Sequence, residues 1–183
     1  MLLKTQRLHI RPIQLEDAKA VFAYRSDAIA NKYQSWVPQS LAEVTAFIKR
    51  NPTQFNLPKT WFQLVLTHKI SHEILGDIGL HFIDEQGQQA EIGCTLDKKF
   101  QSQGYATEAL KAIIDHLFSI LKKHRITASI DPNNTKSIRL MERLGFRKEA
   151  HHIESYFFKG EWTDDLIYAL LAREWPKDQN PNG

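Results

Sequence analysis

Residues 101–107 read Gln-Ser-Gln-Gly-Tyr-Ala-Thr and separate a β-rich run from a long helical pattern. The first amides of a helix have no acceptor within the helix and lie at the positive end of its dipole, so this junction suits an anion. Gly104 lets the backbone approach a ligand closely, and the small Ala106 leaves the first turn uncrowded. Neither the Walker Gly-Lys-Ser/Thr nor the three Rossmann glycines occur. The loop therefore predicts a phosphate site at a helix start, and the alternative is an ordinary turn around Gly104.

On both sides of this loop, segments with apolar residues at strand spacing alternate with segments at helical spacing. The helical spacing starts at four places: at Leu15, after a capping box that begins at Ser40, after Gly104, and at Asn134 or Thr135. A strand, the Gly104 helix and a second strand form a crossover that must be parallel and right-handed, whereas short turns elsewhere give antiparallel pairs. The pattern predicts an α/β (α+β) fold, in which about four helices flank a mixed, mostly antiparallel sheet of about seven strands with a central parallel pair. The expected strands cover residues 7–12, 61–67, 73–83, 90–96, 125–131, 146–158 and 162–171.

Length and composition favour one domain, residues 1–176, followed by a polar tail at 177–183. The 183 residues carry 24 Lys and Arg against 21 Asp and Glu, and this net charge of +3 is too weak to argue for nucleic acid. The single cysteine, Cys94, excludes an intrachain disulfide, and no signal-peptide pattern follows Met1. No apolar run approaches the roughly 18 residues that span a bilayer. A cytoplasmic protein without membrane contact is the expectation.

Two ordered motifs resemble one known family. Gln101-x-x-Gly104-x-Ala106 resembles the acyl-CoA signature of the GCN5-related N-acetyltransferases (GNAT), which opens the helix after their fourth strand. Residues 134–137, Asn-Thr-Lys-Ser, with the later Gly145-Phe146, look like the next block of that family. The resemblance covers nearly the whole chain and implies a single GNAT-like domain. Four further segments are similar to the branch that contains the ribosomal-protein N-terminal (RimJ/RimL-type) acetyltransferases: residues 5–11, Trp36-Val37-Pro38, Glu91-Ile92-Gly93 and Gly160-x-x-x-Asp164.

The resemblance implies acetyl-CoA as cosubstrate and direct transfer of the acetyl group to an amine. In the family, backbone groups of the strand that here ends at Leu96 pair with pantetheine, and amides from Gln103 to Thr107 hold the pyrophosphate. No acyl-enzyme is expected, and Cys94 has no adjacent base, so an inert thiol is the preferred interpretation. The implied cofactor-binding residues are Cys94, Leu96, Gln101, Gln103, Gly104, Tyr105, Ala106, Thr107, Asn134 and Ser137.

Three side chains are candidates for the chemistry. Ser137 aligns with a serine that is proposed to give a proton to the CoA sulfur, and its alternative is a helix-start hydroxyl bonded to the backbone. Glu91, where the two central strands of the family splay, is a candidate base through water. Glu154 lies in the region where the ribosomal branch places a catalytic glutamate. The spacing from Glu154 to Gly160 is about two residues longer than the spacing expected for that glutamate, and Tyr156 is nearer the matching position. An exposed strand glutamate is the alternative for Glu154.

The acceptor class stays open at this point. A protein or peptide N-terminus is favoured because the pKa of an α-amine is near 7.7, against about 10.4 for Lys, so deprotonation costs less. The alternatives are a polyamine, an amino acid, an aminoglycoside, or a CoA-binding module without catalysis. Dimers are common in the resembling branch, so a homodimer is expected by analogy alone.

Other titratable groups point to no further site. The pairs His68 with His72 and His151 with His152 join no carboxylate or Cys at ligand spacing, so no metal is expected. The basic run at residues 122–125 is interpreted as a solvated helix end, and an anion or RNA patch is the lesser alternative.

Overall fold

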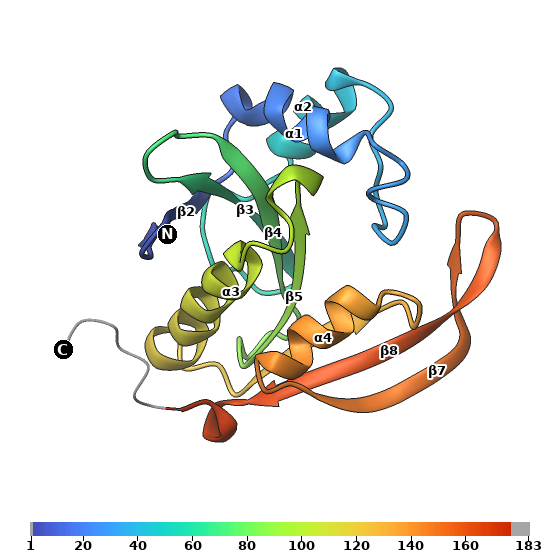
Figure 1. Cartoon of the computed structure of the whole chain (residues 1–183). Coiled ribbons are helices and arrows are strands. Elements are labelled where there is room, and N and C mark those ends of the chain that lie inside the picture. The colour runs from blue at the N-terminus through green and yellow to red at the C-terminus, as the bar shows by residue number, and fades with distance from the viewer. Residues whose placement is uncertain (1, 177–183) are drawn as a thin grey trace.

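A computed structural model describes residues 2–176, and the expected tail at 177–183 lies outside the described residues. Eight strands form one sheet in the order β1-β2-β3-β4-β5-β6-β8-β7 (Figure 1). All neighbours are antiparallel except β5 and β6, which confirms the predicted mixed sheet with its central parallel pair. The strands are β1 Leu3–Lys4, β2 Leu8–Pro12, β3 Thr60–His68, β4 Ile74–Phe82, β5 Gln89–Leu96, β6 Arg125–Ile130, β7 Arg147–Phe158 and β8 Glu161–Leu171.

The helices cover opposite faces of this sheet. Leu64 and Val65 are neighbours on β3 and therefore point to opposite faces. Leu64 joins the larger apolar cluster, which includes residues of α3 and α4, and Val65 joins the smaller cluster under α1 and α2. Figure 1 shows α1 and α2 at the top and α3 and α4 in front of the sheet. The helices are α1 Ala18–Arg25, α2 Leu41–Lys49, α3 Tyr105–Asp115 and α4 Thr135–Arg143.

The parallel pair of strands is joined only at its beginning. Register pairs link Gln89 to Arg125, Ala90 to Ile126 and Glu91 to Thr127. Beyond Glu91 the pairing of β5 with β6 stops, although β5 stays paired with β4 as far as Leu96. The edge of β5 that faces β6 therefore has backbone groups that β6 does not pair. We call this opening the β5–β6 splay.

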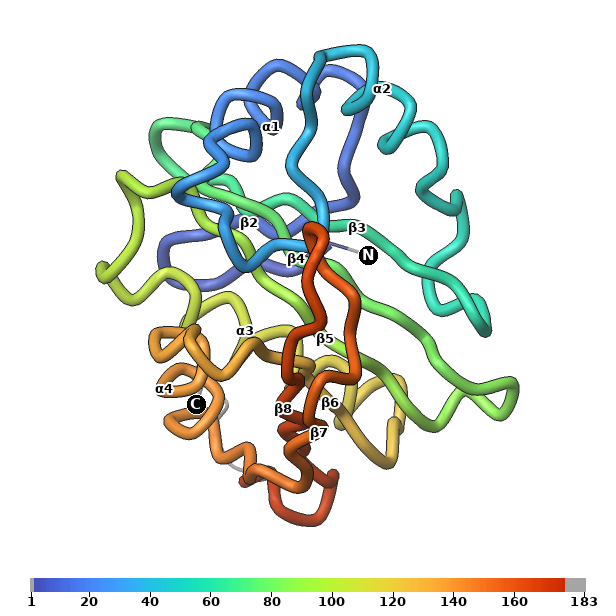
Figure 2. The backbone as a smooth tube through the Cα atoms, turned by 90° about the vertical axis from the view of Figure 1, so that its right-hand side faces the viewer, coloured from blue at the N-terminus to red at the C-terminus, as the bar shows by residue number. Residues whose placement is uncertain are grey.

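The last two strands form a hairpin that reaches back over the molecule. Its turn is at Lys159 and Gly160, both with positive φ, as the sequence predicts. Figure 2 shows the hairpin tip beneath the loop between α1 and α2, where Lys159 Nζ donates to the Lys32 carbonyl at 3.0 Å. The register shifts within β7 before Ala150 and before Tyr156, so this strand of 12 residues is irregular at two places.

Two local predictions need correction. The Ser40 hydroxyl accepts from the Glu43 amide at 3.2 Å, as predicted, but the backbone amide that donates to the Glu43 carboxylate is that of Gln39, at 3.1 Å, instead of that of Ser40. The basic run at 122–125 is not a solvated end throughout, because Lys123 is only 1% exposed. Its Nζ donates to Asn56 Oδ1 at 2.6 Å, so burial is offset by hydrogen bonds, and the direction of its pKa shift is downward through desolvation.

Candidate active site

The start of α3 is built to receive an anion. Gly104 adopts φ 83° and begins the helix without any side-chain cap. By contrast, Ser40 caps α2 and Asn134 caps α4 with a side-chain oxygen. The first amides of α3 therefore point outward without a capping acceptor, at the positive end of the helix dipole. This geometry fits the pyrophosphate role that the motif implies.

An ion pair from the N-terminal segment holds this loop. Arg7 Nε donates to Glu108 Oε2 at 2.6 Å, and a second guanidinium nitrogen donates to the Gln103 carbonyl at 3.1 Å. The guanidinium carbon also lies 4.2 Å from the centre of the Tyr105 ring. Burial of Glu108 acts to raise its pKa, but hydrogen bonds from Thr5 and Arg7 outweigh it, and the net shift is downward. The loop itself is indicated by the sequence motif. The residues that hold the loop in place lie about one hundred positions earlier in the chain.

The β5–β6 splay begins close to this loop. Gln101 Nε2 donates to the Leu96 carbonyl at 3.1 Å, which ties the phosphate loop to the end of β5. The unpaired edge of β5 includes Cys94 and Leu96 and matches the backbone role that the resemblance assigns to them. Burial raises the pKa of the Cys94 thiol to about 12, so this side chain carries negligible thiolate at neutral pH.

Asn134 and Ser137 meet at the start of α4. Asn134 Oδ1 accepts from the Ser137 amide at 3.2 Å, so the amide side chain is a helix cap. The Ser137 hydroxyl is half-buried and makes no hydrogen bond with residues 2–176. Within that range the backbone-bonded alternative is not observed, and the hydroxyl is available to a ligand.

Glu91 and Glu154 occupy very different surroundings. The Glu91 side chain is 30% exposed at the mouth of the splay. Burial raises its pKa, His81 acts against this rise, and the charge of Asp165 adds to it. His81 Nδ1 lies 3.8 Å from Glu91 Oε2. Glu154 is exposed on the irregular part of β7 at φ 44°, where only its amide is held, by Asp164 at 2.9 Å. The structure brings Glu91 together with His81 and leaves the Glu154 carboxylate in solvent.

An open floor lies beside Glu91. Gly79 on β4 and Gly93 on β5 are cross-strand partners on the same face of the sheet as Glu91. A Cβ added at Gly93 would meet nothing within 4 Å, so this floor is accessible from above. On the same face, α2 and β3 enclose a pocket of about 240 Å³ lined by Phe47, Arg50, Asn51, Trp61 and Gln63.

A family model described as an acetyltransferase (GNAT) domain matches residues 7–147, well over half of the chain. The chain belongs to the GNAT family. As a GNAT protein it is an N-acetyltransferase that uses acetyl-CoA.

A curated relative and a solved structure each match nearly the whole chain. An uncharacterized N-acetyltransferase, p20, of Bacillus licheniformis is 33% identical over 175 residues, which cover 94% of this chain and 97% of that protein. A GNAT acetyltransferase of Bacillus anthracis, solved by crystallography, has a TM-score of 0.86 at 30% identity and covers 95% of this chain and 100% of its own.

Two relatives carry named acceptors. The ribosomal protein uS5 alanine N-acetyltransferase of Escherichia coli is 34% identical over 84 residues, 46% of this chain and 43% of that protein. The spermidine N-acetyltransferase of Vibrio cholerae, solved with CoA and spermine, shares the fold at a TM-score of 0.79 and 20% identity, covering 91% of this chain and 96% of its own.

A buried polar cluster, which no sequence motif indicates, supports the GNAT site from the α1 side. Asp77 on β4 accepts hydrogen bonds from Tyr24, Arg25 and Gln63. Arg25 also donates to Thr95 Oγ1 at 3.2 Å and so reaches the cofactor strand β5. Burial alone would lower the pKa of Arg25, but Asp77 raises it, so the guanidinium stays charged. The cluster fixes β5 behind the splay.

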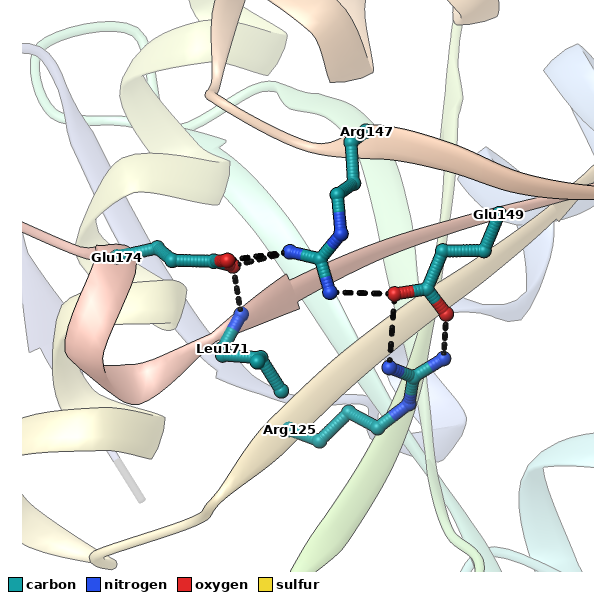
Figure 3. A network of polar contacts seen from close by, with 5 residues as sticks. All are labelled: Arg125, Arg147, Glu149, Leu171 and Glu174. Atoms are coloured by element: carbon teal, nitrogen blue, oxygen red, sulfur yellow. Dashed lines mark hydrogen bonds and ion pairs between the residues drawn. The ribbon is translucent and has the colours of Figure 1, made fainter.

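Ion pairs tie the other side of the splay together. Arg125, at the first register pair of β5 and β6, binds Glu149 of β7 through both guanidinium nitrogens, as Figure 3 shows. Glu149 also accepts from Arg147, which in turn contacts Glu174, and Glu174 accepts from the Leu171 amide. The network links β6, β7 and the end of β8, so these strands are positioned as one unit beside the splay.

Among residues 2–176, no three His, Cys, Asp or Glu side chains are grouped as metal ligands. In the same range, no helix has the length and apolar character that crossing a membrane requires.

Proposed function

We propose that this N-acetyltransferase acetylates the N-terminal α-amine of a protein or peptide. The observation that carries the proposal is the open floor at Gly93, which lies beside the half-buried Glu91 and on the same face as the Phe47–Trp61 pocket. Phe47 and Trp61 are the apolar lining residues of that pocket, Arg50 is its charged lining residue, and no lining residue is acidic. The pocket therefore suits an apolar side chain of a peptide better than the second ammonium of a polyamine.

Each step of the reaction has a candidate group on this chain. Acetyl-CoA supplies the thioester. Glu91 removes a proton from the ammonium, directly or through one water, and its raised pKa suits it to this task at neutral pH. The nitrogen then bonds to the acetyl carbon and the carbon–sulfur bond breaks. The Ser137 hydroxyl delivers a proton to the leaving sulfur and regains one from the attacking nitrogen, which loses its second proton as the amide forms. The first amides of α3 hold the pyrophosphate.

Polyamine acetylation is the second candidate. A polar pocket of about 340 Å³ next to the hairpin is lined by Asp131, Asp164 and Trp162, among others, and carboxylates with an aromatic face suit an ammonium. Asp164 is already bonded to His151 at 2.7 Å, which reduces its free charge. The relative solved with spermine makes this candidate worth testing.

The deciding experiment measures release of the CoA thiol from acetyl-CoA by the purified protein. The panel holds N-terminal peptides, polyamines, amino acids and aminoglycosides, and mass spectrometry identifies the product. We expect release with peptides, and peptides with an apolar residue near the N-terminus should have the lowest KM. Release with polyamines alone would replace the proposal by the second candidate. CoA binding without release would favour a non-catalytic module.

The Ser137 role has its own test. Ser137→Ala should lower turnover about tenfold while leaving CoA affinity within twofold, because the hydroxyl acts only on the leaving group. Unchanged turnover would remove Ser137 from the mechanism.

We further propose a domain spanning residues 1–176 and a cytoplasmic location, in keeping with the single Cys94.

A further inference from the structure

Three residues form a row across three adjacent strands beside the floor of the site. Trp61 on β3 is the direct register partner of His81 on β4, and His81 is the direct partner of Glu91 on β5. Direct partners point to the same face of a sheet. We call these residues the Trp61–His81–Glu91 row. It leads from the mouth of the splay towards the Phe47–Trp61 pocket, which Trp61 lines.

The imidazole of His81 is held in one orientation. Its ring lies parallel to the Trp61 indole, with 4.8 Å between centroids and 6° between planes. The indole can lie flat there because β4 has Gly79 underneath, where a Cβ would be 3.2 Å from Trp61 Cζ3. Trp61 remains 51% exposed, so it serves as a platform rather than as core. The platform directs Nδ1 of His81 at Glu91 Oε2, 3.8 Å away.

Among the titratable groups that face Glu91, His81 is the one that can accept a proton from the Glu91 carboxyl group. From β4 Glu91 faces His81, and from β8 it faces Asp165, whose carboxylate accepts from Ser129 Oγ at 2.7 Å. The charge of Asp165 disfavours a second negative charge on Glu91. The His81 side chain is 28% exposed and borders both Glu91 and solvent.

We propose that His81 is a proton relay that removes the acquired proton from Glu91 in each catalytic cycle. The proton that Glu91 takes from the substrate ammonium passes to Nδ1 of the neutral imidazole, and the imidazolium then releases it to water. The sum over one cycle is an ammonium and a thioester converted to an amide, a thiol and one released proton. Rotation of the Glu91 side chain or one bridging water closes the 3.8 Å gap. The inference rests on the proposed function and deepens it.

The test is chemical rescue in a His81→Ala variant. The substitution leaves a slot against Trp61 that imidazole can fill. We expect kcat to fall at least tenfold and to recover in proportion to added imidazole, more strongly as its neutral form becomes abundant with rising pH. Affinity for acetyl-CoA should change less than twofold. His81→Gln keeps a polar side chain of similar size but accepts no proton near neutral pH, so it should be as slow as His81→Ala.

The control and the contrary outcomes are well defined. His124→Ala removes an exposed imidazole at the start of β6 and should change neither kcat nor the response to imidazole. Full activity of His81→Gln would overturn the relay and leave His81 a packing role. A folded His81→Ala protein, as judged by its melting curve, that is slow yet insensitive to imidazole would overturn it as well.

Failure of the relay differs from failure of the proposed function. If the wild-type protein acetylates no amine of the panel, the proposed function fails. If the wild-type protein is active and Glu91→Gln is inactive while both His81 variants keep wild-type kcat and pH profile, only the relay fails.

Discussion

The two ends of the active site are built differently. At the α3 start, where we propose that the cosubstrate binds, backbone amides lack a capping acceptor, and the Arg7–Glu108 pair and Gln101 fix the loop from outside. At the proposed acceptor end, the proposed catalytic groups are partly exposed side chains of the Trp61–His81–Glu91 row, in which His81 stacks on Trp61. Backbone recognition suits a cosubstrate that every family member shares. Side-chain recognition suits an acceptor that differs between relatives.

The largest effect on turnover that separates the two ends is expected at Glu91. Glu91→Gln keeps the size of the side chain but removes the base, so kcat should fall about 100-fold or more, with CoA affinity unchanged. Glu154→Gln is the matched substitution at the exposed carboxylate on β7 and should change kcat less than twofold. Steady-state kinetics with the preferred peptide measure both. The reverse ranking would move the base to the hairpin.

At the cofactor end, a backbone substitution should act on binding. Gly104→Val forces a β-branched residue into φ 83° and places Cβ 3.3 Å from Arg7 Nη2, so CoA should bind about tenfold more weakly. Gly160→Val introduces similar strain at φ 92°, with nothing within 4 Å, and should leave CoA affinity unchanged. Calorimetric titration with CoA distinguishes the two. Equal losses of affinity would mean that general strain, not the α3 start, explains the effect.

A smaller effect is expected on stability at the same end. The lowered pKa of Glu108 means that its stabilisation is complete above the ordinary value of 4.5 and is lost as pH falls through the lower folded value. Glu108→Gln should therefore reduce the free energy of unfolding by about 1–2 kcal/mol at pH 7, and by progressively less in acid. Urea unfolding across pH measures this. Glu85→Gln, which breaks an exposed pair with Lys59, should cost less than about 0.5 kcal/mol.

The smallest effect belongs to the acceptor end and has the opposite sign. Because the folded pKa of Glu91 is raised, its ionisation costs stability as pH rises from 4.5 through the folded value. Glu91→Gln should accordingly be more stable than the wild-type protein at pH 7, by about 0.5 kcal/mol, and equal to it near pH 4. Lower stability at pH 7 would show that the carboxylate supports the fold instead of straining it.

The sequence predicted the parts of this molecule that depend on neighbouring residues. The Gly104 loop, the helix that begins at Asn134 or Thr135 and the crossover between parallel strands are local patterns, and the structure has all three. The two-residue strand β1 was missed because so short a segment has no period. The burial of Lys123 was missed because its partners, Asn56 and Gly87, come from distant loops.

The acceptor end was harder to predict for the same reason. Glu91 was identified as a candidate through its motif, but neither His81 nor Trp61 stood out. Their meeting depends on the register of three strands, and that register includes a shift between Leu66 and Thr67. Likewise, Asp77 gains its role only when α1 brings Tyr24 onto β4.

The early end of pairing between β5 and β6 has a thermodynamic consequence. A ligand that lies along the free edge of β5 binds the native sheet and not the unfolded chain, so it shifts the folding equilibrium by mass action. At a ligand concentration one hundred times Kd, the free energy of unfolding should rise by about 2.7 kcal/mol. Acetyl-CoA is then a folding partner as well as a reactant, and the midpoint of thermal unfolding should report its concentration.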